Sequence, residues 1–241
     1  MIALISSVPE EGKLFTRQLK KKSIVAGKHL YKGRIHGGNV VYMVSGMGKT
    51  NAVHGATILL EKFSPSMLIL FGVGGAYPSS GLRVGDIAVA EKEVYGDEGV
   101  MTRDGFQGIE FIGIPFAVKG EKQYFNEFPL DRELAGKALG SLMSVTLPSA
   151  GSIAAGSGRF VTVSTCTGTR KRAIELQKRF GSICENMEGA AVAHICTLYG
   201  TPMIEIRGIS NIVGDRDSAK WDIRLAAENC QKVVMEVMKG L

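Results

Sequence analysis

Short apolar runs alternate with amphipathic stretches along the whole chain of 241 residues. The runs are rich in Val, Ile and Leu and mostly lack polar alternation, as strands covered on both faces do. Between two of them, Lys49–Phe63 places its apolar residues at i, i+3 and i+4, which is typical of an amphipathic helix. This alternation of strands and helices predicts an α/β fold with a largely parallel central sheet.

The predicted elements extend from one end of the chain to the other. The expected strands are Ile2–Ser7, Val40–Ser45, Met67–Val73, Asp86–Ala90, Phe160–Ser164 and Met203–Ile209. The expected helices are Lys49–Phe63, Asp131–Leu142, Thr169–Phe180, Glu188–Tyr199 and Ile223–Lys239. Gly96 to Pro129 is the least regular region, and we expect it to leave the sheet as a functional excursion. No linker of biased composition and no internal repeat divides the chain, so residues 1–241 are predicted to form a single domain.

Composition excludes several classes of protein. No apolar run approaches the roughly 18–20 residues that span a bilayer, and no basic region precedes the first apolar run, so we expect a cytoplasmic protein with no membrane partner. The net charge is +6 and the pI is about 9.1. However, the one dense basic cluster, Lys20-Lys21-Lys22, has no aromatic residues interleaved with it. We therefore expect a solvated face and no nucleic-acid partner, although a basic protein would attract an anionic small substrate.

The four cysteines, Cys166, Cys184, Cys196 and Cys230, are widely spaced and include no Cys-x-x-Cys pair. This spacing indicates reduced thiols, with neither a bound metal nor a disulfide framework.

Two glycine-rich segments resemble nucleotide-binding motifs but do not satisfy them. Gly48-Lys49-Thr50 would end a phosphate-binding loop only if a glycine stood at position 43, where the chain has Met43. Gly72–Tyr77 follows a strand but lacks the third glycine of the dinucleotide fingerprint, and turn residues follow it. We interpret this second segment as a glycine-rich strand end where backbone N–H groups can approach a ligand closely.

Three polar segments lie at strand ends or at a helix start and are expected at one end of the sheet, where ligands bind in open α/β folds. They are Glu10-Glu11, Met187-Glu188 and the Arg207–Asn211 stretch. Each also has a simpler explanation. Glu10 and Glu11 could lie at the solvent-exposed start of a helix, and Glu188 could interact favourably with a helix dipole at the N-terminus. Ser210 and Asn211 could cap the next helix. Arg207 is harder to dismiss, because an arginine in an apolar strand needs a carboxylate partner.

Together these residues could break an N-glycosidic bond, which passes through an oxocarbenium-like sugar. That reaction is helped by a carboxylate that activates water, by groups that stabilise the departing base, and by a grip on the sugar hydroxyls. A carboxylate such as Glu188 can accept two hydrogen bonds from a vicinal diol.

The order and spacing of these segments resemble the purine nucleoside phosphorylase and nucleosidase superfamily. The similarity is greatest to its branch of 5′-methylthioadenosine/S-adenosylhomocysteine nucleosidases and futalosine hydrolases, and it includes the 19-residue step from Glu188 to Arg207. The matching segments are Ile2–Glu11, Ser45–Lys49, Phe71–Ala76, Val84–Ile87, Gly158–Val161, Met187–Ala191 and Arg207–Ser210. The resemblance implies a three-layer nucleoside phosphorylase/hydrolase-like fold, with a mixed, largely parallel, twisted central sheet flanked by helices.

The resemblance also implies roles for individual residues. Glu11 would position the attacking water, with Glu10 as the alternative. Met187 would pack on the ribose and Glu188 would take its hydroxyls. The remaining substrate-binding residues would be Gly74 on the sugar side, Phe160 and Val161 beside the base, and Arg207 and Ser210 as polar support.

Asn211 stands where methylthioadenosine nucleosidases carry an aspartate that protonates N7 of adenine. An amide can donate to N7 or to a 6-oxo group, which a carboxylate would repel, so the sequence favours hypoxanthine over adenine. Segments including Ser164–Thr169 and Asn211–Asp217 look like those of futalosine hydrolases. Such enzymes act on an inosine-type nucleoside with a carboxyphenyl ketone at its 5′ end. Candidates for that 5′ group are Arg216, Lys220 and Trp221, together with Arg103 and Phe106.

Alternative functions remain open at this stage. A 5′-methylthioadenosine/S-adenosylhomocysteine or aminodeoxyfutalosine nucleosidase would share most of the site. A nucleoside-binding sensor would share the fold and the sugar grip without catalysis. Phosphorolysis would need clustered arginines near the acidic turn, and the chain has none before Arg17. We expect no metal and no organic cofactor, a small-molecule purine nucleoside as substrate, and a homodimer, as in the family the chain resembles.

Overall fold

Alternating strands and helices build a three-layer α/β fold, in agreement with the prediction. The computed structural model describes residues 1–142 and 154–241. Its central sheet has ten strands, with the order β11-β6-β12-β13-β5-β1-β4-β3-β2, while β14 pairs with both β5 and β6. The ten strands are β1 Ile2–Ser6, β2 Lys21–Val25, β3 Lys28–Ile35, β4 Gly38–Val44, β5 Met67–Ala76, β6 Ile87–Tyr95, β11 Glu127–Pro129, β12 Ala155–Thr162, β13 Ser182–Asn186 and β14 Met203–Ile212.

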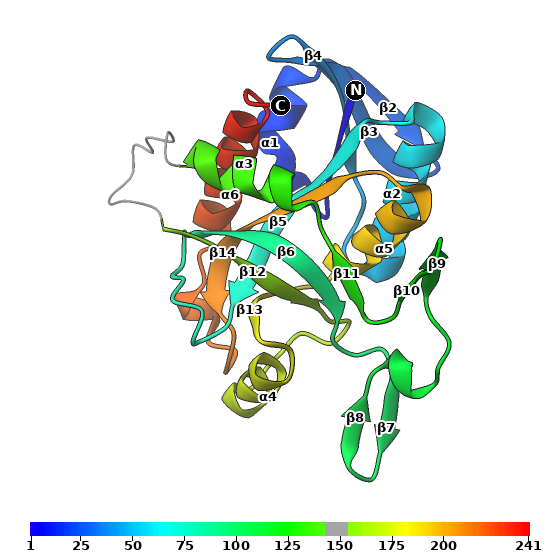
Figure 1. The fold of residues 1–241 in the computed structure, drawn as a ribbon. Helices are drawn as coiled ribbons and strands as arrows, with labels where there is room; N and C mark the ends of the chain where they lie inside the picture. The colour runs from blue at the N-terminus through cyan, green and yellow to red at the C-terminus, as the bar shows by residue number, and fades with distance from the viewer. Residues whose placement is uncertain (143–153) are drawn as a thin grey trace.

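Helices cover both faces of this sheet (Figure 1). One apolar cluster joins α1, α3 and α6 to one face, and another joins α2 and α5 to the opposite face. The helices are α1 Lys13–Gln18, α2 Lys49–Phe63, α3 Arg132–Leu142, α4 Arg170–Phe180, α5 Gly189–Tyr199 and α6 Ile223–Val237. Five of the six coincide with predicted helices to within two residues at each end, because their apolar spacing and caps are visible in sequence. For example, Thr169 accepts a hydrogen bond from the N–H of Arg172, and Asp222 accepts one from the N–H of Leu225.

The sheet is mixed. The strands β4, β1, β5 and β14 run parallel to one another, as do β6, β12 and β13. Antiparallel pairings occur at the outer strands β2, β3 and β11, and where β13 meets β5 and β14 meets β6. The strand β1 pairs with the amino-terminal half of β5, whereas the carboxyl-terminal end of β5 lies between β14 on one side and β13 on the other. This crowding gathers residues distant in sequence around the end of β5.

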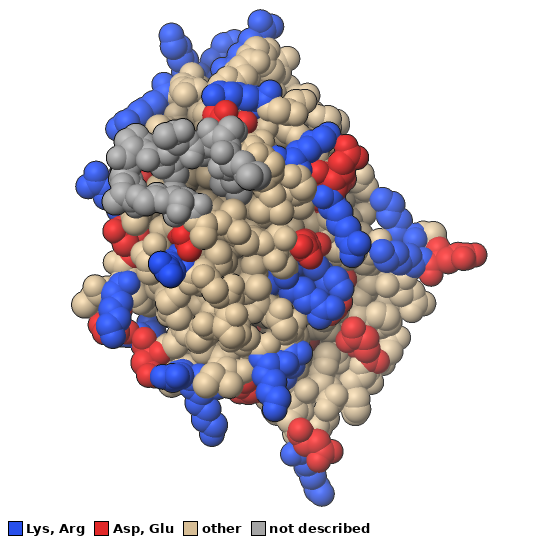
Figure 2. Space-filling view, turned by 60° about the vertical axis from the view of Figure 1, so that its left-hand side comes forward, with Lys and Arg blue, Asp and Glu red and all other residues tan. Residues whose placement is uncertain are grey.

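The lysine cluster expected on a solvated face lies mainly on β2, the last strand of the sheet. Lys21 and Lys22 are exposed there, and charged side chains on an edge strand discourage pairing with another chain. Figure 2 shows basic and acidic side chains interspersed over one face of the molecule. No helix within residues 1–142 and 154–241 is both long and apolar enough to cross a bilayer.

The region from Gly96 to Pro129 leaves the sheet, as predicted, but it is more ordered than its glycines suggest. It forms two small hairpins, a 3₁₀ turn and the edge strand β11. The additional elements are β7 Val100–Thr102, β8 Gly105–Gln107, η2 Ile109–Phe111, β9 Ala117–Lys119 and β10 Lys122–Tyr124. Asn126 ties the region to the sheet, because its amide donates to the carbonyls of Tyr95 and Glu98 and accepts from the N–H of Ile109.

Candidate active site

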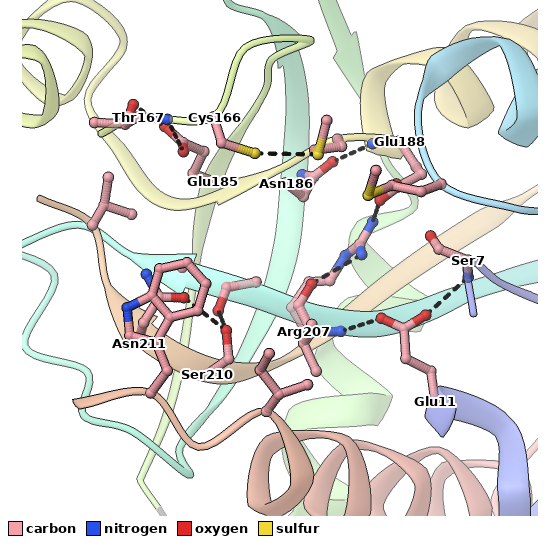
Figure 3. Close-up of a pocket in the computed structure, with 18 of the residues that line it drawn as sticks. Ser7, Glu11, Cys166, Thr167, Glu185, Asn186, Glu188, Arg207, Ser210 and Asn211 are labelled. Carbon is pink, nitrogen blue, oxygen red and sulfur yellow. Dashed lines mark hydrogen bonds and ion pairs between the residues drawn. The ribbon is translucent and has the colours of Figure 1, made fainter. Parts of the chain in front are cut away.

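A cavity of about 330 Å³ lies at the carboxyl-terminal residues of β1, β5, β13 and β14. This volume is in the range of small-molecule pockets and can take one nucleoside. Figure 3 shows that its walls come from segments far apart in sequence. The lining residues are Ser7, Val8, Glu11, Met47, Val73, Gly74, Gly75, Cys166, Thr167, Glu185, Asn186, Met187, Glu188, Arg207, Ser210, Asn211, Val213, Arg216, Trp221 and Ile223.

Glu11 lies at one end of the cavity, in the 3₁₀ turn η1 (Pro9–Gly12) that follows β1. The N–H groups of Ser7 and Val8 donate to its Oε2 at 2.9 and 3.1 Å, and the N–H of Val73 donates to its Oε1 at 2.8 Å. Burial raises the pKa of this carboxyl above its ordinary value, while the charge of Arg207 and the N–H donors oppose that rise. A buried carboxylate with a raised pKa and a fixed orientation is suited to general-base chemistry. Glu10, the alternative, is exposed and does not line the cavity.

Gly72 leaves the room that Glu11 occupies. A Cβ atom at this position would come within 2.4 Å of Oε1 of Glu11. The glycine-rich end of β5 therefore lets a buried carboxylate approach the strand backbone closely. The close approach of a ligand to these glycines, which we expected from the sequence, stays a prediction.

Arg207 lies at the centre of the site, on β14, with its side chain only 1% exposed. Its Nε donates to Oε1 of Glu205 at 2.8 Å, and a terminal nitrogen contacts Oε2 of Glu188 at 3.3 Å. Its other terminal nitrogen donates to the carbonyl of Val73 at 3.1 Å. Burial acts to lower the pKa of Arg207, but the carboxylates of Glu205, Glu188 and Glu11 more than offset this effect and raise it. The carboxylate partners that its position required are therefore present.

Glu188 precedes α5 and is held at both of its oxygens. Its Oε1 accepts the N–H of Gly48 at 2.9 Å, and its Oε2 faces Arg207. Asn186 caps the start of α5, because its amide oxygen accepts hydrogen bonds from the N–H groups of Glu188 and Gly189. Since Asn186 serves the start of the helix, the Glu188 side chain remains directed into the cavity, next to Met187.

A second pair of acidic residues lies behind Arg207, outside the cavity. Glu93 accepts hydrogen bonds from Thr162 at 2.7 Å and from Asn186 at 2.6 Å, while Oε2 of Glu205 is buried without a hydrogen-bond donor. A Cβ atom placed on Gly189 would lie 2.0 Å from Oε1 of Glu93 and 2.4 Å from Oε2 of Glu205, so the two carboxyl groups are neighbours. Burial, followed by the charge of Glu205, raises the pKa of Glu93 well above its ordinary value of 4.5. We infer that a proton on Glu93 supplies the donor that Glu205 lacks.

The end of the cavity opposite Glu11 is formed by Ser210 and Asn211 (Figure 3). The hydroxyl of Ser210 lies 2.8 Å from the amide oxygen of Asn211 and 3.2 Å from the carbonyl of Gly74. Because the Ser210 hydroxyl can donate to that oxygen, the amide NH₂ of Asn211 is free to donate toward a ligand. Gly74 lines the same part of the cavity.

The structure does not bring Phe160, Val161 or Phe106 to the cavity. Phe160 and Val161 are fully buried in two apolar clusters, because β12 extends to Thr162 and both residues lie inside the strand. Phe106 packs on Phe180 and on the guanidinium of Arg179, at the excursion. Among residues 1–142 and 154–241, the cavity wall next to β12 comes instead from the loop beyond its end, at Cys166 and Thr167.

Sequence reasoning also missed Glu185 as a site residue. It belongs to β13, a short strand with a polar end that we did not predict. Met47, from the Gly46–Gly48 turn, likewise lines the opening, where it is 61% exposed.

Two of the candidates for a 5′ group lie at the cavity. The guanidinium of Arg216 stacks 4.8 Å from the ring centre of Trp221, and both residues line the wall. Lys220 is largely exposed and pairs with Asp217, and Arg103 is not part of the lining. As for metal binding, residues 1–142 and 154–241 contain no group of three His, Cys, Asp or Glu side chains that could hold an ion.

The Glu93 proton predicts a specific dependence of stability on pH. Because the folded pKa of Glu93 lies above its value in the unfolded chain, the stabilisation is complete below about pH 4.5 and is lost as pH rises toward the folded pKa. The loss can reach about 1.4 kcal/mol per pH unit. Glu93→Gln carries no titrating proton, so its free energy of unfolding, measured with urea between pH 5 and 9, should fall less steeply than that of wild type.

The amide of this variant cannot reproduce every hydrogen bond of a protonated carboxyl, so a constant loss of about 1 kcal/mol is expected at all pH values. Glu127→Gln, on the neighbouring and more exposed strand β11, serves as the control and should keep the wild-type slope. An unchanged slope in Glu93→Gln would mean that Glu93 is ionised in the folded protein.

Comparisons with known proteins agree with this geometry. The sequence pattern of the phosphorylase superfamily matches residues 1–239. A futalosine hydrolase from Thermus thermophilus is 32% identical over 207 residues, which is 85% of this chain and 83% of that protein. A 5′-methylthioadenosine/S-adenosylhomocysteine nucleosidase from Oceanobacillus iheyensis is 29% identical over 245 residues, covering 100% of this chain and 99% of that protein.

Solved structures share the fold. The 5′-methylthioadenosine/S-adenosylhomocysteine nucleosidase of Neisseria meningitidis, in complex with methylthio-immucillin-A, superimposes with a TM-score of 0.84 at 24% identity, covering 100% of this chain and 99% of that one. The Helicobacter pylori nucleosidase with an aspartate-to-asparagine substitution, bound to 5′-methylthioadenosine, gives a TM-score of 0.83 at 20% identity, with 100% and 98% coverage. From its match over residues 1–239 and from its relatives, this chain belongs to the phosphorylase superfamily.

Proposed function

We propose that this protein is a futalosine hydrolase, an N-glycosyl hydrolase that cleaves futalosine to hypoxanthine and dehypoxanthine futalosine in menaquinone biosynthesis. The relatives named above are nucleosidases, which supports hydrolysis of a purine nucleoside as the reaction. The observation that carries the choice of base is Asn211, whose amide NH₂ is left free by the Ser210 hydroxyl. Such a donor suits N7 and O6 of a 6-oxopurine.

The geometry suggests how the reaction proceeds. In this proposal the base lies toward Asn211, the ribose lies over Met187 with its hydroxyls on Glu188, and C1′ faces Glu11; all four residues line the cavity. Glu11 accepts a proton from water as that water attacks C1′, and the electrons of the N-glycosidic bond move into the purine. Asn211 donates hydrogen bonds to the departing base, which stabilises the negative charge that develops there. The purine anion then takes a proton from solvent to give hypoxanthine, and Glu11 returns its proton to solvent.

Water is the nucleophile in this proposal because the surroundings of Glu11 disfavour phosphate. Among the residues that line the described cavity, the cations are Arg207 and Arg216. Arg207 is already engaged by Glu205 and Glu188, and Arg216 lies beside Trp221. An incoming phosphate dianion would instead meet the carboxylates of Glu11 and Glu188.

The deciding assay uses purified protein with futalosine, inosine and 5′-methylthioadenosine, each with and without phosphate, and identifies the free base. Hypoxanthine released from futalosine without phosphate supports the proposal. Adenine released from 5′-methylthioadenosine as the main product would instead favour the second candidate, the activity carried by the relative from Oceanobacillus iheyensis.

Glu11→Gln should reduce kcat by about 10²–10⁴-fold, because the amide cannot take a proton from water. Substrate binding, measured by calorimetry, should change little, since the amide oxygen can still accept the N–H groups of Ser7 and Val8, and only the hydrogen bond from the N–H of Val73 is lost to the NH₂ group. Glu10→Gln is the matched control, because this neighbouring glutamate is exposed, and it should retain wild-type turnover. If Glu10→Gln lost activity and Glu11→Gln kept it, the roles of the two residues would be reversed.

We further propose that Arg216 binds the carboxylate of the 5′ substituent while the ring of Trp221 packs on its aromatic part. Arg216→Ala should raise KM for futalosine by about 10-fold or more, as loss of a charge-assisted hydrogen bond does. KM for inosine, which lacks the carboxylate, should be nearly unchanged. Lys220→Ala removes an exposed cation nearby and should leave both constants alone, whereas equal effects of Arg216→Ala on the two substrates would exclude this role.

The protein is also proposed to be a homodimer. Phe111, Ile112 and Ile114 in the excursion are 49–67% exposed, a concentration of apolar surface that is typical of an interface. Sedimentation equilibrium should give twice the chain mass of 25.8 kDa. A monomer at micromolar concentration would refute this part of the proposal.

A further inference from the structure

Glu185 is a buried carboxylate in the cavity wall for which the mechanism above has no use. It is 8% exposed and lines the same cavity as Asn211. The N–H of Thr167 donates to its Oε1 at 2.9 Å, and the hydroxyls of Thr167 and Tyr77 donate to its Oε2 at 2.5 and 2.9 Å. These three donors come from protein groups and fix the orientation of the carboxylate.

The sheet places Glu185 and Asn211 on either side of one glycine. Gly75 of β5 pairs with Glu185 of β13 on one side and with Asn211 of β14 on the other. Residues directly opposite in neighbouring strands project to the same face of a sheet, so both side chains face the cavity. Gly75 has no side chain between them, and the space that a Cβ would need there is occupied by Cγ2 of Val213, at 2.7 Å, and by Nδ2 of Asn211, at 3.2 Å. The two polar groups therefore flank the methyl of Val213, which lines the cavity and beside which the edge of a flat base can lie.

The edge of a 6-oxopurine presents three groups in order: the acceptor N7, the acceptor O6 and the donor N1–H. Adenine presents N7, an amino donor and the acceptor N1. An amide NH₂ on one side of O6 and a carboxylate on the other complement the first order, because the carboxylate accepts N1–H. Against adenine the same carboxylate would face the N1 lone pair, which repels it. A carboxylate offers about four acceptor sites, and three are used by Thr167 and Tyr77, so one remains for a ligand.

We propose that Glu185 is a specificity-determining residue, which accepts the N1–H of the 6-oxopurine while Asn211 donates to the O6 and N7 side. The inference rests on the proposed function, since it concerns the base released by that reaction. In this proposal, Glu185 and Asn211 together discriminate against adenine, one on each side of O6. A site built to pair with a polar substrate group rejects an analogue that lacks this group, because its own buried polar atom is then left without a partner.

The test compares inosine with 1-deazainosine, in which a C–H replaces N1–H while the shape of the base is kept; its 6-oxo tautomer carries the ring proton on N3, so the donor is lost from the N1 position. Values of kcat/KM are measured for both nucleosides with wild type and with Glu185→Gln, whose neutral amide is a weaker acceptor. Dividing one inosine/1-deazainosine ratio by the other cancels the intrinsic difference between the two leaving groups. We expect the wild-type ratio to be about 10-fold or more above that of the variant, the factor that a hydrogen bond to a charged group typically supplies. The preference for inosine over adenosine should fall by a similar factor.

Glu175→Gln is the matched control, because Glu175 is exposed on α4 and pairs with Arg172 and Arg179. It should keep both wild-type ratios. Should Glu185→Gln fail to fold, calorimetry on wild type answers the same question with the free bases. Hypoxanthine should then bind about 10-fold or more tightly than 1-deazahypoxanthine.

The outcomes separate this inference from the function on which it rests. Suppose that wild type cleaves futalosine or inosine. If its kcat/KM is the same for 1-deazainosine as for inosine, or if Glu185→Gln leaves both kcat/KM ratios unchanged, the role of Glu185 is refuted and the function stands. If wild type cleaves only 6-aminopurine nucleosides, both proposals fall together.

Discussion

The burial of Arg207 is the constraint on which the site depends. A guanidinium in the interior is costly unless carboxylates surround it, and Arg207 meets Glu205 behind it and Glu188 in front. The same arginine holds the carbonyl of Val73, whose N–H in turn holds Glu11. One cation thus links Glu188, the proposed ribose ligand, and Glu11, the proposed water-activating acid, to the glycine-rich strand β5. Exchanging Arg207 would leave several buried carboxylates without a counter-charge, so we regard it as a positioning residue.

The arrangement of charge along the cavity follows from this centre. Glu11 and Glu188 surround the position proposed for the sugar, where positive charge develops as the N-glycosidic bond breaks. Asn211 is neutral and presents donors at the other end, where the base accumulates negative charge. Glu205 contacts the arginine on the side away from the cavity, next to Glu93, and neither of these two acids lines the cavity. The site is therefore anionic at the sugar and donating at N7 of the base, which is the polarity that departure of a purine requires.

Sequence alone located the residues whose positions follow from strand ends. Glu11, Glu188, Arg207 and Asn211 each stand at or beyond the carboxyl end of a recognisable strand or at a helix start, and the structure places all four in one cavity. Phe160 and Val161 were assigned to the base from the family resemblance, whereas the structure places both inside β12, buried in apolar clusters. The loop that follows this strand reaches the cavity instead, at Cys166 and Thr167.

Other features depend on information that no local pattern carries. Strand β13 ends in Glu185 and Asn186, and two polar residues in a five-residue strand resemble a loop. The lysines of β2 likewise make this edge strand difficult to recognise from the sequence. The pairing of Glu185 and Asn211 across Gly75 requires the order of β13, β5 and β14, which only the folded sheet supplies. Hence the residues proposed to act on the sugar could be predicted from the sequence, whereas Glu185, the second group proposed to select the base, could not.

The most direct test of this account is a crystal structure of the Glu11→Gln variant with uncleaved inosine. The account predicts that the ribose hydroxyls contact the carboxylate of Glu188, that N7 and O6 lie within hydrogen-bond distance of the Asn211 amide, and that C1′ faces residue 11. An inosine bound with its base toward residue 11, or with its ribose away from Glu188, would contradict it.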